Sequence, residues 1–353
     1  MQFLFTTLIH ARLSFYKNKT HKIEKPVGVS IIIAARNESD NLYENLPSIL
    51  NQDYPEFEVI VVNNQSIDDS GWLLTAFQQQ YKNLHIVELE KNKHIRPGKK
   101  LPITLAIKGA KYDYFLLTDV DCKPKSNQWI KKMTSKFVNK NEIVIGYAPY
   151  LKNKGFLNKI IRFDVAWVGI NYISMALSQL PYMASGKNLA YSKKIFDSVN
   201  GFKTHYAVSS GDDDLFIQEA AKNSNYSVEI DPDTFCYAPA PSSWTSWMAE
   251  KAKNYATSSR HKLIKKWVLG IYPLTLILMW FLFVPLLFVT DFRNLSLGIF
   301  LFVLVYKWFI QGRCMMKLKE NNFIKFLPIW DLLYALLMPV IYYLTERQKF
   351  YKW

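Results

Sequence analysis

Cysteine is scarce in this chain of 353 residues, which contains only Cys122, Cys236 and Cys314. Their wide spacing includes no CxxC pair, so a zinc site of the finger type and a dense disulfide framework are both excluded. Glycine is also infrequent, and the 13 glycines form neither a GxGxxG motif nor a phosphate loop. The sequence therefore argues against binding of dinucleotides or ATP by the usual motifs.

The start of the chain lacks the basic leader of a secretory signal. Residues 1–16 are apolar and aromatic but contain His10 and Arg12. The stretch is also too short to cross about 30 Å of hydrocarbon. We therefore expect residues 1–25 to be an N-terminal interfacial segment.

The bulk composition lies between those of soluble proteins and transporters. Half of the residues are hydrophobic (50%), and the mean hydropathy is −0.05. This favours an aqueous domain joined to a membrane segment. Lys and Arg outnumber Asp and Glu by 44 to 29, which favours an anionic neighbour such as nucleic acid or the cytoplasmic leaflet. Because the tail is apolar, we predict membrane lipids as the partner, and no nucleic acid.

Short apolar runs alternate with helical patterns in the first part of the chain. The predicted strands are 29–34, 58–62, 85–89, 114–118 and 143–147. The predicted helices behind them are 42–49, 71–81, 99–111 and 127–138. This alternation predicts an α/β fold with a mostly parallel sheet covered on both faces. Ligands of such sheets bind beyond the carboxyl ends of the strands, where the polar clusters of this sequence fall.

The last third of the chain is predicted to meet the membrane. Residues 244–266 are basic and aromatic, as expected of an amphipathic interfacial region. Residues 267–290 and 292–310 are each long enough to span a bilayer. Residues 326–345 form a third span or, because of Pro328 and Pro339, a re-entrant hairpin. We thus predict a catalytic domain at 26–243 and a transmembrane region at 267–353.

Basic residues predict the orientation in the membrane. Clusters at 260–266, 313–325 and 347–352 favour the cytoplasmic side. The protein is therefore predicted to be a multi-pass protein of the cell inner membrane with a cytoplasmic catalytic domain. Three full spans would put the basic C-terminal end outside, which favours re-entry of the third segment.

Asp119 and Asp121 are the strongest chemical signal. Carboxylates at i and i+2 point to the same side where a buried strand ends, so together they can hold one hard cation. Mg²⁺ or Mn²⁺ is usually bound by one or two carboxylates plus substrate phosphates. The pattern also occurs by chance in solvated acidic turns.

Asp212, Asp213 and Asp214 form a second acidic cluster, which precedes an apolar helix. One Asp at a helix start can simply cap free backbone N–H groups. Three in succession exceed that need, and crowded carboxylates raise one another's pKa. Such a cluster suits a general base.

Three further groups are candidates for binding. Lys99 and Lys100 follow Pro97-Gly98 and could meet phosphate oxygens, although a surface charge pair has the same pattern. Asn63 could read a base or ribose edge, or simply form a turn. Trp244 could stack on a sugar, although an interfacial belt is the default for Trp in a membrane protein.

Together these motifs resemble those of family 2 glycosyltransferases, the inverting enzymes with a GT-A fold, and especially their membrane-bound bacterial branch related to polysaccharide synthases. The resemblance covers roughly residues 27–260. It rests on the order and spacing of VSIIIAARNE, EVIVVNNQSIDDS, PGKK, LLTDVDCKP, SGKNLAYSKKIFDSVNGF and SGDDDLFIQEA.

The resemblance implies a role for each motif. The donor nucleotide is expected near Ala35, Arg36, Glu38, Asn63, Lys99 and Asp119. Asp119 and Asp121 are expected at the metal and the diphosphate. The family's base falls on Asp212, with Asp213 as the other candidate. Residues Gly186, Asn188, Asp214 and Trp244 are assigned to the acceptor side.

Two departures from the family pattern affect the expected activity. Gly211 replaces the Glu of the family's Glu-Asp-x-Asp-Leu motif, which is why Asp213 stays a candidate base. The Gln-x-x-Arg-Trp motif of processive synthases has only residues 250–254 as its nearest match, without Gln or Trp. We therefore expect a non-processive enzyme that moves sugar from a nucleotide-sugar donor to a lipid-linked or glycan acceptor. The alternative is an inactive membrane-bound sugar-binding or scaffold protein that keeps the fold.

Overall fold

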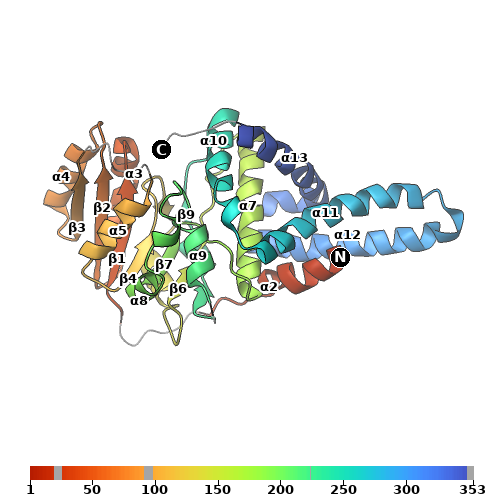
Figure 1. Ribbon diagram of the computed structural model, residues 1–353, viewed down its shortest axis with the longest axis horizontal. Coiled ribbons are helices and arrows are strands. Elements are labelled where there is room, and N and C mark those ends of the chain that lie inside the picture. Colours follow the sequence, from red (N-terminus) through yellow and green to blue (C-terminus); the bar gives the residue numbers. More distant parts are fainter. Residues whose placement is uncertain (20–25, 91–97, 223, 348–353) are drawn as a thin grey trace. The chain divides into compact units, whose positions relative to one another are not determined.

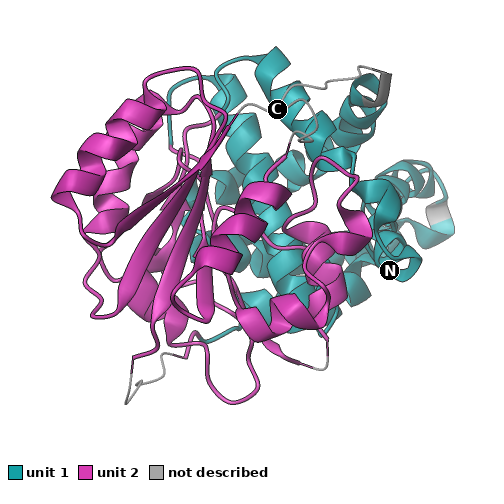
Figure 2. Cartoon of the chain, turned by 60° about the vertical axis from the view of Figure 1, so that its left-hand side comes forward, with its two compact units in different colours: residues 1–17, 152–182, 241–351 teal, residues 18–151, 183–240, 352–353 magenta. Residues whose placement is uncertain are grey.

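The computed structural model describes residues 1–19, 26–90, 98–222 and 224–347. Pro97 and the basic C-terminal end at 348–352, both used above, lie outside the described residues. The chain forms two compact units (Figure 2). The sheet unit comprises residues 18–151 and 183–240, and the helical unit comprises residues 1–17, 152–182 and 241–351.

The sheet unit is built on seven strands in the order β3-β2-β1-β4-β7-β6-β8 (Figure 1). The strands are β1 (Val29–Ala35), β2 (Phe57–Asn64), β3 (Leu84–Leu89), β4 (Tyr114–Leu117), β6 (Ile143–Ile145), β7 (Leu189–Ser192) and β8 (Tyr226–Val228). All pairs are parallel except β4 with β7 and β7 with β6. The mostly parallel sheet is confirmed, and β1, β2 and β4 are almost fully buried, as continuous apolar runs require.

Strand β7 has no counterpart among the predicted strands. It contains only four residues, all buried, and it lies between β4 and β6. Such a short run gives little periodicity, so only the tertiary pairing identifies it as a strand. A separate two-stranded sheet pairs β5 (Lys123–Pro124) with β9 (Cys236–Tyr237), directly after the acidic pair at 119 and 121.

Helices cover the sheet between the strands. They are α3 (Ser39–Leu50), α4 (Ser70–Gln80), α5 (Lys100–Gly109), α6 (Trp129–Thr134), α8 (Lys193–Ser198) and α9 (Asp214–Ala220). Helix α6 is shorter than the predicted 127–138. The hydroxyls of Thr134 and Ser135 donate to the carbonyls of Lys131 and Lys132, and this local bonding competes with continuation of the helix.

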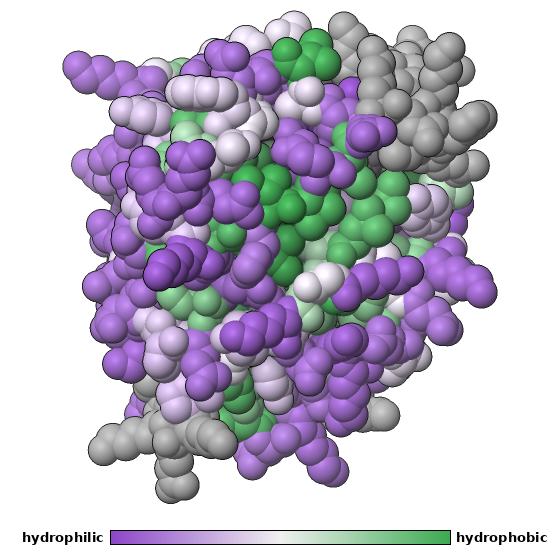
Figure 3. Space-filling view, turned by 90° about the vertical axis from the view of Figure 1, so that its left-hand side faces the viewer, coloured by the Kyte–Doolittle hydropathy of each residue, from purple (hydrophilic) through white to green (hydrophobic). Residues whose placement is uncertain are grey.

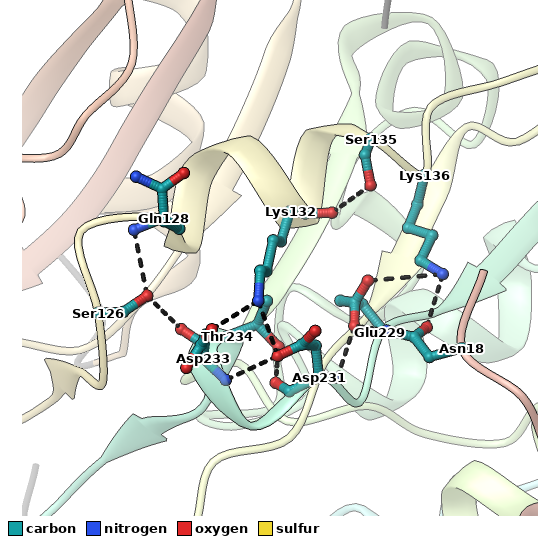
Figure 4. A network of polar contacts seen from close by, with 10 residues as sticks. All are labelled: Asn18, Ser126, Gln128, Lys132, Ser135, Lys136, Glu229, Asp231, Asp233 and Thr234. Atoms are coloured by element: carbon teal, nitrogen blue, oxygen red, sulfur yellow. Dashed lines mark hydrogen bonds and ion pairs between the residues drawn. The ribbon is translucent and has the colours of Figure 1, made fainter. Parts of the chain in front are cut away.

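Two lysines of the α6 region tie distant segments of the sheet unit together (Figure 4). Lys132 Nζ lies 2.9 Å from Asp231 Oδ1 and 2.6 Å from Asp233 Oδ2. Lys136, which is buried, donates to Asn18 and pairs with Glu229 at 3.5 Å. These bonds fix the segment after β8 and the first residues of the unit against α6.

The surface of the molecule on the side of α4 and the edge strand β3 is mostly hydrophilic. Figure 3 faces this side and shows polar side chains around a central group of hydrophobic ones. In β3 itself, Ile86 and Val87 are only partly buried.

In the described part of the chain, the helical unit contains the N-terminal helical stretch, five longer helices and short 3-10 turns. The stretch comprises α1 (Gln2–Phe5), η1 (Thr6–His10) and α2 (Ala11–Ser14). The other helices are α7 (Phe156–Leu177), α10 (Trp244–Tyr255), α11 (Leu263–Leu286), α12 (Arg293–Lys317) and α13 (Leu327–Arg347). Among the described residues, four helical segments are long and apolar enough to cross a membrane: α7, α11, α12 and Asn321–Thr345.

Burial separates these four segments into two kinds. The most apolar window of α7 is 78% buried inside the protein, whereas that of α11 is 11% buried. Helix α7 is therefore covered by protein, while α11, α12 and α13 expose large apolar side chains that would be costly in water.

Segment 326–345 is one helix. Pro328 lies in its first turn, where its missing N–H costs no hydrogen bond, and Pro339 is accommodated inside α13. The re-entrant hairpin that we considered from the two prolines is therefore not the structure. Helix α11 begins at Leu263, earlier than the predicted 267, and α12 extends to Lys317.

The N-terminal stretch is packed into the helical unit. One face, which includes Gln2, Phe5 and Leu13, is buried, and Gln2 Nε2 donates to the carbonyl of Tyr272 in α11 at 2.7 Å. The opposite face exposes Phe3, Leu4 and Leu8. The stretch is thus a component of the helix bundle with one apolar face left open.

Among the described residues of this unit, three buried ion pairs join a helix to another helix or, for Glu320, to the segment between α12 and η6. Arg162 pairs with Glu320, Lys251 with Asp164 at 2.8 Å, and Lys307 with Asp331 at 3.1 Å. Removing one partner of such a pair leaves an uncompensated buried charge, which is strongly destabilising. The pairs therefore fix which helix faces meet.

Candidate active site

The loops that follow β1 and β2 are joined to each other at the carboxyl edge of the sheet. Asn37, which adopts a positive φ of 55°, accepts from the backbone N–H of Ile67 at 2.8 Å, and its own N–H donates to Ser66 Oγ. Asp68 accepts from the N–H of Ser39, at the start of α3. Ala35 is buried at the end of β1, and the half-buried Arg36 begins the loop. Sequence reasoning missed Asn37 and Asp68 as organisers of this edge.

The acidic pair after β4 is matched by two lysines. Lys99 Nζ forms an ion pair with Asp119 Oδ1, and Lys187 Nζ lies 2.8 Å from Asp121 Oδ2. The ammonium group of Lys187 also lies 5.3 Å from the ring centre of Tyr150. Lys99 was expected near the donor, whereas Lys187 was not singled out, because it lies far from the acidic pair in sequence.

The electrostatics show that several charged groups converge here. Burial lowers the pKa of Lys99, but the charges of Asp119, Asp212 and Asp121 raise it by a larger amount. The net shift of this pKa is therefore upward. Burial raises the pKa of Glu38, as do the charges of Asp121 and Asp119. Lys99 therefore lies within reach of the charges of both acidic clusters, and Glu38 lies within reach of those of the first. Among the described residues, no group of three or more His, Cys, Asp or Glu side chains forms a preassembled metal site.

The second acidic cluster differs in its partners. Asp213 Oδ2 accepts from the N–H of Gly186 at 2.9 Å, and its Oδ1 accepts from the N–H of Asp214 at 2.7 Å. Burial, with the charges of Asp212 and Asp214, raises the pKa of Asp213 to about 7. The partly buried Asp212 makes no side-chain hydrogen bond within the described part of the chain.

Two glycines shape the turn that carries this cluster. A Cβ on Gly186 would lie 3.3 Å from Asp213 Oδ2, so a larger residue would crowd the bond between them. Gly211 has a φ of +98°, and a Cβ there would lie 2.7 Å from Leu215. A Glu at position 211, as in the family motif, would therefore require a different turn.

Lys100 holds the loop that leads into the second cluster. Its buried ammonium group donates to the carbonyls of His205, Val208 and Ser210 at 2.7, 2.9 and 2.6 Å. This lysine was considered as a phosphate ligand with Lys99, but its donors are directed to the backbone. It is thus a positioning residue for residues 205–210.

Asn63 lies near the carboxyl end of β2. Its amide nitrogen donates to Glu88 Oε2 at 2.8 Å, and its Oδ1 is an acceptor. This oxygen is buried and finds no hydrogen-bond partner among the described residues. An unpaired buried acceptor is costly, and a donor on a bound ligand would relieve that cost.

The remaining predicted acceptor residues occupy different environments. Asn188 is fully buried, accepts from Trp129 Nε1 at 3.0 Å, and donates to the carbonyls of Tyr147 and Thr234. Its side chain is therefore engaged inside the protein. Asp214 is buried at the start of α9, where its Oδ1 accepts from the N–H of Leu215. Trp244 is exposed and belongs to the helical unit.

A mostly parallel sheet with helices on its faces, an acidic pair after its fourth strand and a second acidic cluster near that pair define a GT-A glycosyltransferase fold. Residues 30–199 match the sequence model of Glycosyl transferase family 2. The resemblance that the motifs predicted is thus confirmed over these residues.

Curated relatives of the chain are similar over a limited length. A poly-beta-1,6-N-acetyl-D-glucosamine synthase of Staphylococcus epidermidis is 24% identical over 232 residues, which cover 65% of this chain and 53% of the relative. A poly(ribitol-phosphate) beta-glucosyltransferase of Bacillus spizizenii is 26% identical over 59% of this chain and 32% of its own length. The chain thus spans about half or less of the length of these relatives.

The fold is also similar to that of a solved structure. A mannosyltransferase from Pyrobaculum calidifontis in complex with GDP-Man and Mn²⁺ aligns with a TM-score of 0.56 and 16% identity. The alignment covers 99% of this chain and 93% of the mannosyltransferase. It shows that the two proteins share the fold.

Proposed function

We propose that the chain is an inverting glycosyltransferase that moves a sugar from a nucleoside-diphosphate sugar to a lipid-linked or glycan acceptor. The observation that carries this proposal is the convergence of Asp119, Asp121, Lys99 and Asp212 at one edge of the sheet. The names of the curated relatives, a glucosamine-polymer synthase and a glucosyltransferase, support a hexose donor. In this proposal Ala35, Arg36 and Asn63 meet the nucleotide.

A divalent cation fits the chemistry of the first cluster. Asp119 and Asp121 would hold it, since Mg²⁺ and Mn²⁺ are commonly bound by one or two carboxylates and complete their shell with substrate phosphates. When bound, the cation would neutralise the departing diphosphate. The Mn²⁺ of the structural neighbour supports the same choice of cofactor.

The lysines of the first cluster have a second role in the proposal. Without a donor, Lys99 and Lys187 compensate the two carboxylates. The oxygens of a diphosphate offer these ammonium groups an alternative anionic partner. Lys99 and Lys187 would thus hold the donor while they release the carboxylates for the cation.

We assign the general base to Asp212. Its carboxylate is uncommitted among the described residues, whereas both oxygens of Asp213 already accept backbone N–H bonds. The acceptor hydroxyl transfers its proton to Asp212 as its oxygen attacks the anomeric carbon. The bond from that carbon to the diphosphate oxygen breaks on the opposite face, so the configuration inverts.

Location and acceptor complete the proposal. We place the protein in the cell inner membrane, with domains at 1–25, 26–243, 244–266 and 267–353 and the catalytic domain on the cytoplasmic side. The exposed apolar helices and the basic clusters at 260–266 and 313–325, which flank α11 and α12, support this placement. Gly186, Asn188, Asp214 and Trp244 stay our candidates for the acceptor side. Because Asp214 and Asn188 are buried, we propose that they position the part of the protein that meets the acceptor. The absence of a Gln-x-x-Arg-Trp motif supports non-processive transfer.

A donor panel tests this function. The full chain in detergent is incubated with Mn²⁺, a membrane-lipid extract and individual nucleotide sugars, and products are read by mass spectrometry. We expect one donor to give a lipid whose mass has increased by one or a few hexose-type units, with release of nucleoside diphosphate. Failure of every donor to release nucleoside diphosphate above the level of the Asp121→Asn variant would contradict the proposal.

A further inference from the structure

A groove lies on the surface of the helical unit between α12 and η6 (Asn321–Phe326). Its volume is about 330 Å³, and its walls are apolar apart from one guanidinium, that of Arg313. The wall residues Val305, Trp308 and Phe309 are exposed. Trp308 Nε1 donates to the carbonyl of Ile324 at 2.6 Å, which fixes η6 against α12. The groove is therefore a built feature of the fold.

Arg313 lacks a polar partner within the described residues. Its Nε is buried without a hydrogen-bond acceptor, and the described ion pairs do not include it. The guanidinium is held between two rings, 5.1 Å from the centre of Phe15 and 5.8 Å from that of Phe309. Cation–π contacts stabilise the charge but do not satisfy the N–H donors. An anionic oxygen would supply the missing acceptor.

The groove occupies the basic end of a candidate membrane span. Arg313 and Lys317 lie in the last turns of α12, and Lys319 and Lys325 follow as exposed cations. Basic residues at the end of a span mark the leaflet that carries anionic lipids. The apolar walls at 305–309 extend from Arg313 back along the span, where an acyl chain would lie.

We propose that this groove binds one anionic phospholipid, with the phosphate on Arg313 and an acyl chain along Val305 and Phe309. The proposal rests on the membrane location given above and on no part of the catalytic chemistry. Charge complementarity selects the occupant: a guanidinium with free donors matches the phosphate of a lipid without a cationic headgroup, and the apolar walls match its chain. A zwitterionic lipid offers the same chain but carries its own cation.

Native mass spectrometry of the full chain in detergent tests the site. The protein is mixed with equal amounts of phosphatidylglycerol and phosphatidylcholine, and bound lipid is counted. We expect one phosphatidylglycerol to be retained in preference, and Arg313→Gln to reduce this retention about fivefold, which is the factor expected for one Arg near an anionic surface. The matched control is Arg293→Gln, at the other end of α12, which should retain phosphatidylglycerol like the unchanged chain.

A second variant tests the apolar walls without changing charge. Gly312 lies in the groove, and a Cβ there would lie 3.4 Å from Ile324 Cγ2, so Gly312→Leu fills the space. It should also lose phosphatidylglycerol while Arg313 is intact. Equal retention of both lipids by the unchanged chain would overturn the proposal, as would unchanged retention in Arg313→Gln or Gly312→Leu. A chain that fails to co-sediment with membranes would instead contradict the membrane location itself.

Discussion

The two acidic clusters of the sheet unit carry similar residues in opposite electrostatic settings. Each carboxylate of the first cluster, Asp119 and Asp121, faces a lysine. In the second cluster, Asp213 faces backbone N–H groups and two neighbouring carboxylates, and its pKa rises to about 7. The lysine ammonium groups occupy the place that a bound cation would take beside the carboxylates of the first cluster. Burial and, after it, crowding favour a carboxylate that takes up a proton near neutral pH.

This difference between the two clusters shows that residue type alone does not assign a role to an acidic residue. In the sequence both clusters are groups of Asp next to an apolar element: the first follows a buried strand, and the second precedes an apolar helix. What separates them is the set of partners that the fold brings from elsewhere, namely Lys99 and Lys187 for one and Gly186 for the other. Each prediction below changes one partner or one carboxylate.

The largest effect is expected from Asp121→Asn in the first cluster. The amide keeps the shape but loses the charge that would hold the cation, so kcat should fall on the order of 10³-fold. Sugar transfer by purified protein measures this. Asp53→Asn, which changes an exposed carboxylate of the same unit, is the control and should keep full activity. Comparable activity in both variants would remove Asp121 from the mechanism.

Two matched variants distinguish the roles of Asp212 and Asp213 in the second cluster. Asp212→Asn should lower kcat by about 10²- to 10⁴-fold, the range for loss of a general base. Asp213→Asn should lower it less, because an amide oxygen can still accept one of the two backbone N–H bonds. The reverse order of the two losses would transfer the assignment of the base to Asp213.

The lysine pairing of the first cluster predicts cooperative binding. In the free protein Lys99 competes with a cation for Asp119, and a nucleoside diphosphate removes that competition by binding the lysine. Mn²⁺ should thus bind roughly tenfold more tightly when nucleoside diphosphate is present. Titration of Mn²⁺ by electron paramagnetic resonance measures the ratio. In Lys99→Met the ratio should shrink, because Mn²⁺ binds more tightly without nucleotide; an unchanged ratio would contradict the competition.

The smallest effect is a pH-dependent difference in stability. The pKa of Asp213 is about 7 in the folded protein, above its ordinary value of 3.8. Between these values the folded state holds a proton that the unfolded state has lost, so the free energy of unfolding falls as pH rises. The slope from this group is at most about 1.4 kcal/mol per pH unit.

Asp213→Asn should remove this slope. The stability of the original chain relative to the variant should fall between about pH 4 and 7 and then level off. Denaturant unfolding of the two detergent-solubilised proteins at several pH values measures the difference. A constant difference across that range would show that Asp213 does not hold the proton.

The parts of the fold that local patterns encode were predictable from the sequence. The β-branched runs that became β1 and β2 are long, and their polar ends identify the edge of the sheet where ligands bind. In contrast, β7 contains only four residues and is defined by its pairing with β4 and β6. Helix α6 ended early because Thr134 and Ser135 bond to the backbone.

The candidate site was predictable to the same extent. Motif spacing indicated Asp119, Asp121 and Asp212, because each lies next to a recognisable apolar element. It did not indicate that Lys187 would pair with Asp121, or that Lys100 would hold residues 205–210, because these contacts join segments that are distant in sequence. The same limit applies to Asn188. Its motif suggested a residue that binds the acceptor, but its side-chain amide forms hydrogen bonds inside the protein.

The central claim is that Asp119 and Asp121 exchange their lysine partners for a cation when a nucleotide donor binds. The most direct measurement is an anomalous difference map, at the manganese edge, of crystals grown with Mn²⁺ and a nucleoside diphosphate. We predict a peak that contacts at least one of these carboxylates and the diphosphate, with Lys99 moved onto a phosphate oxygen. A bound nucleotide beside intact Lys99–Asp119 and Lys187–Asp121 pairs, without a manganese peak, would contradict the account.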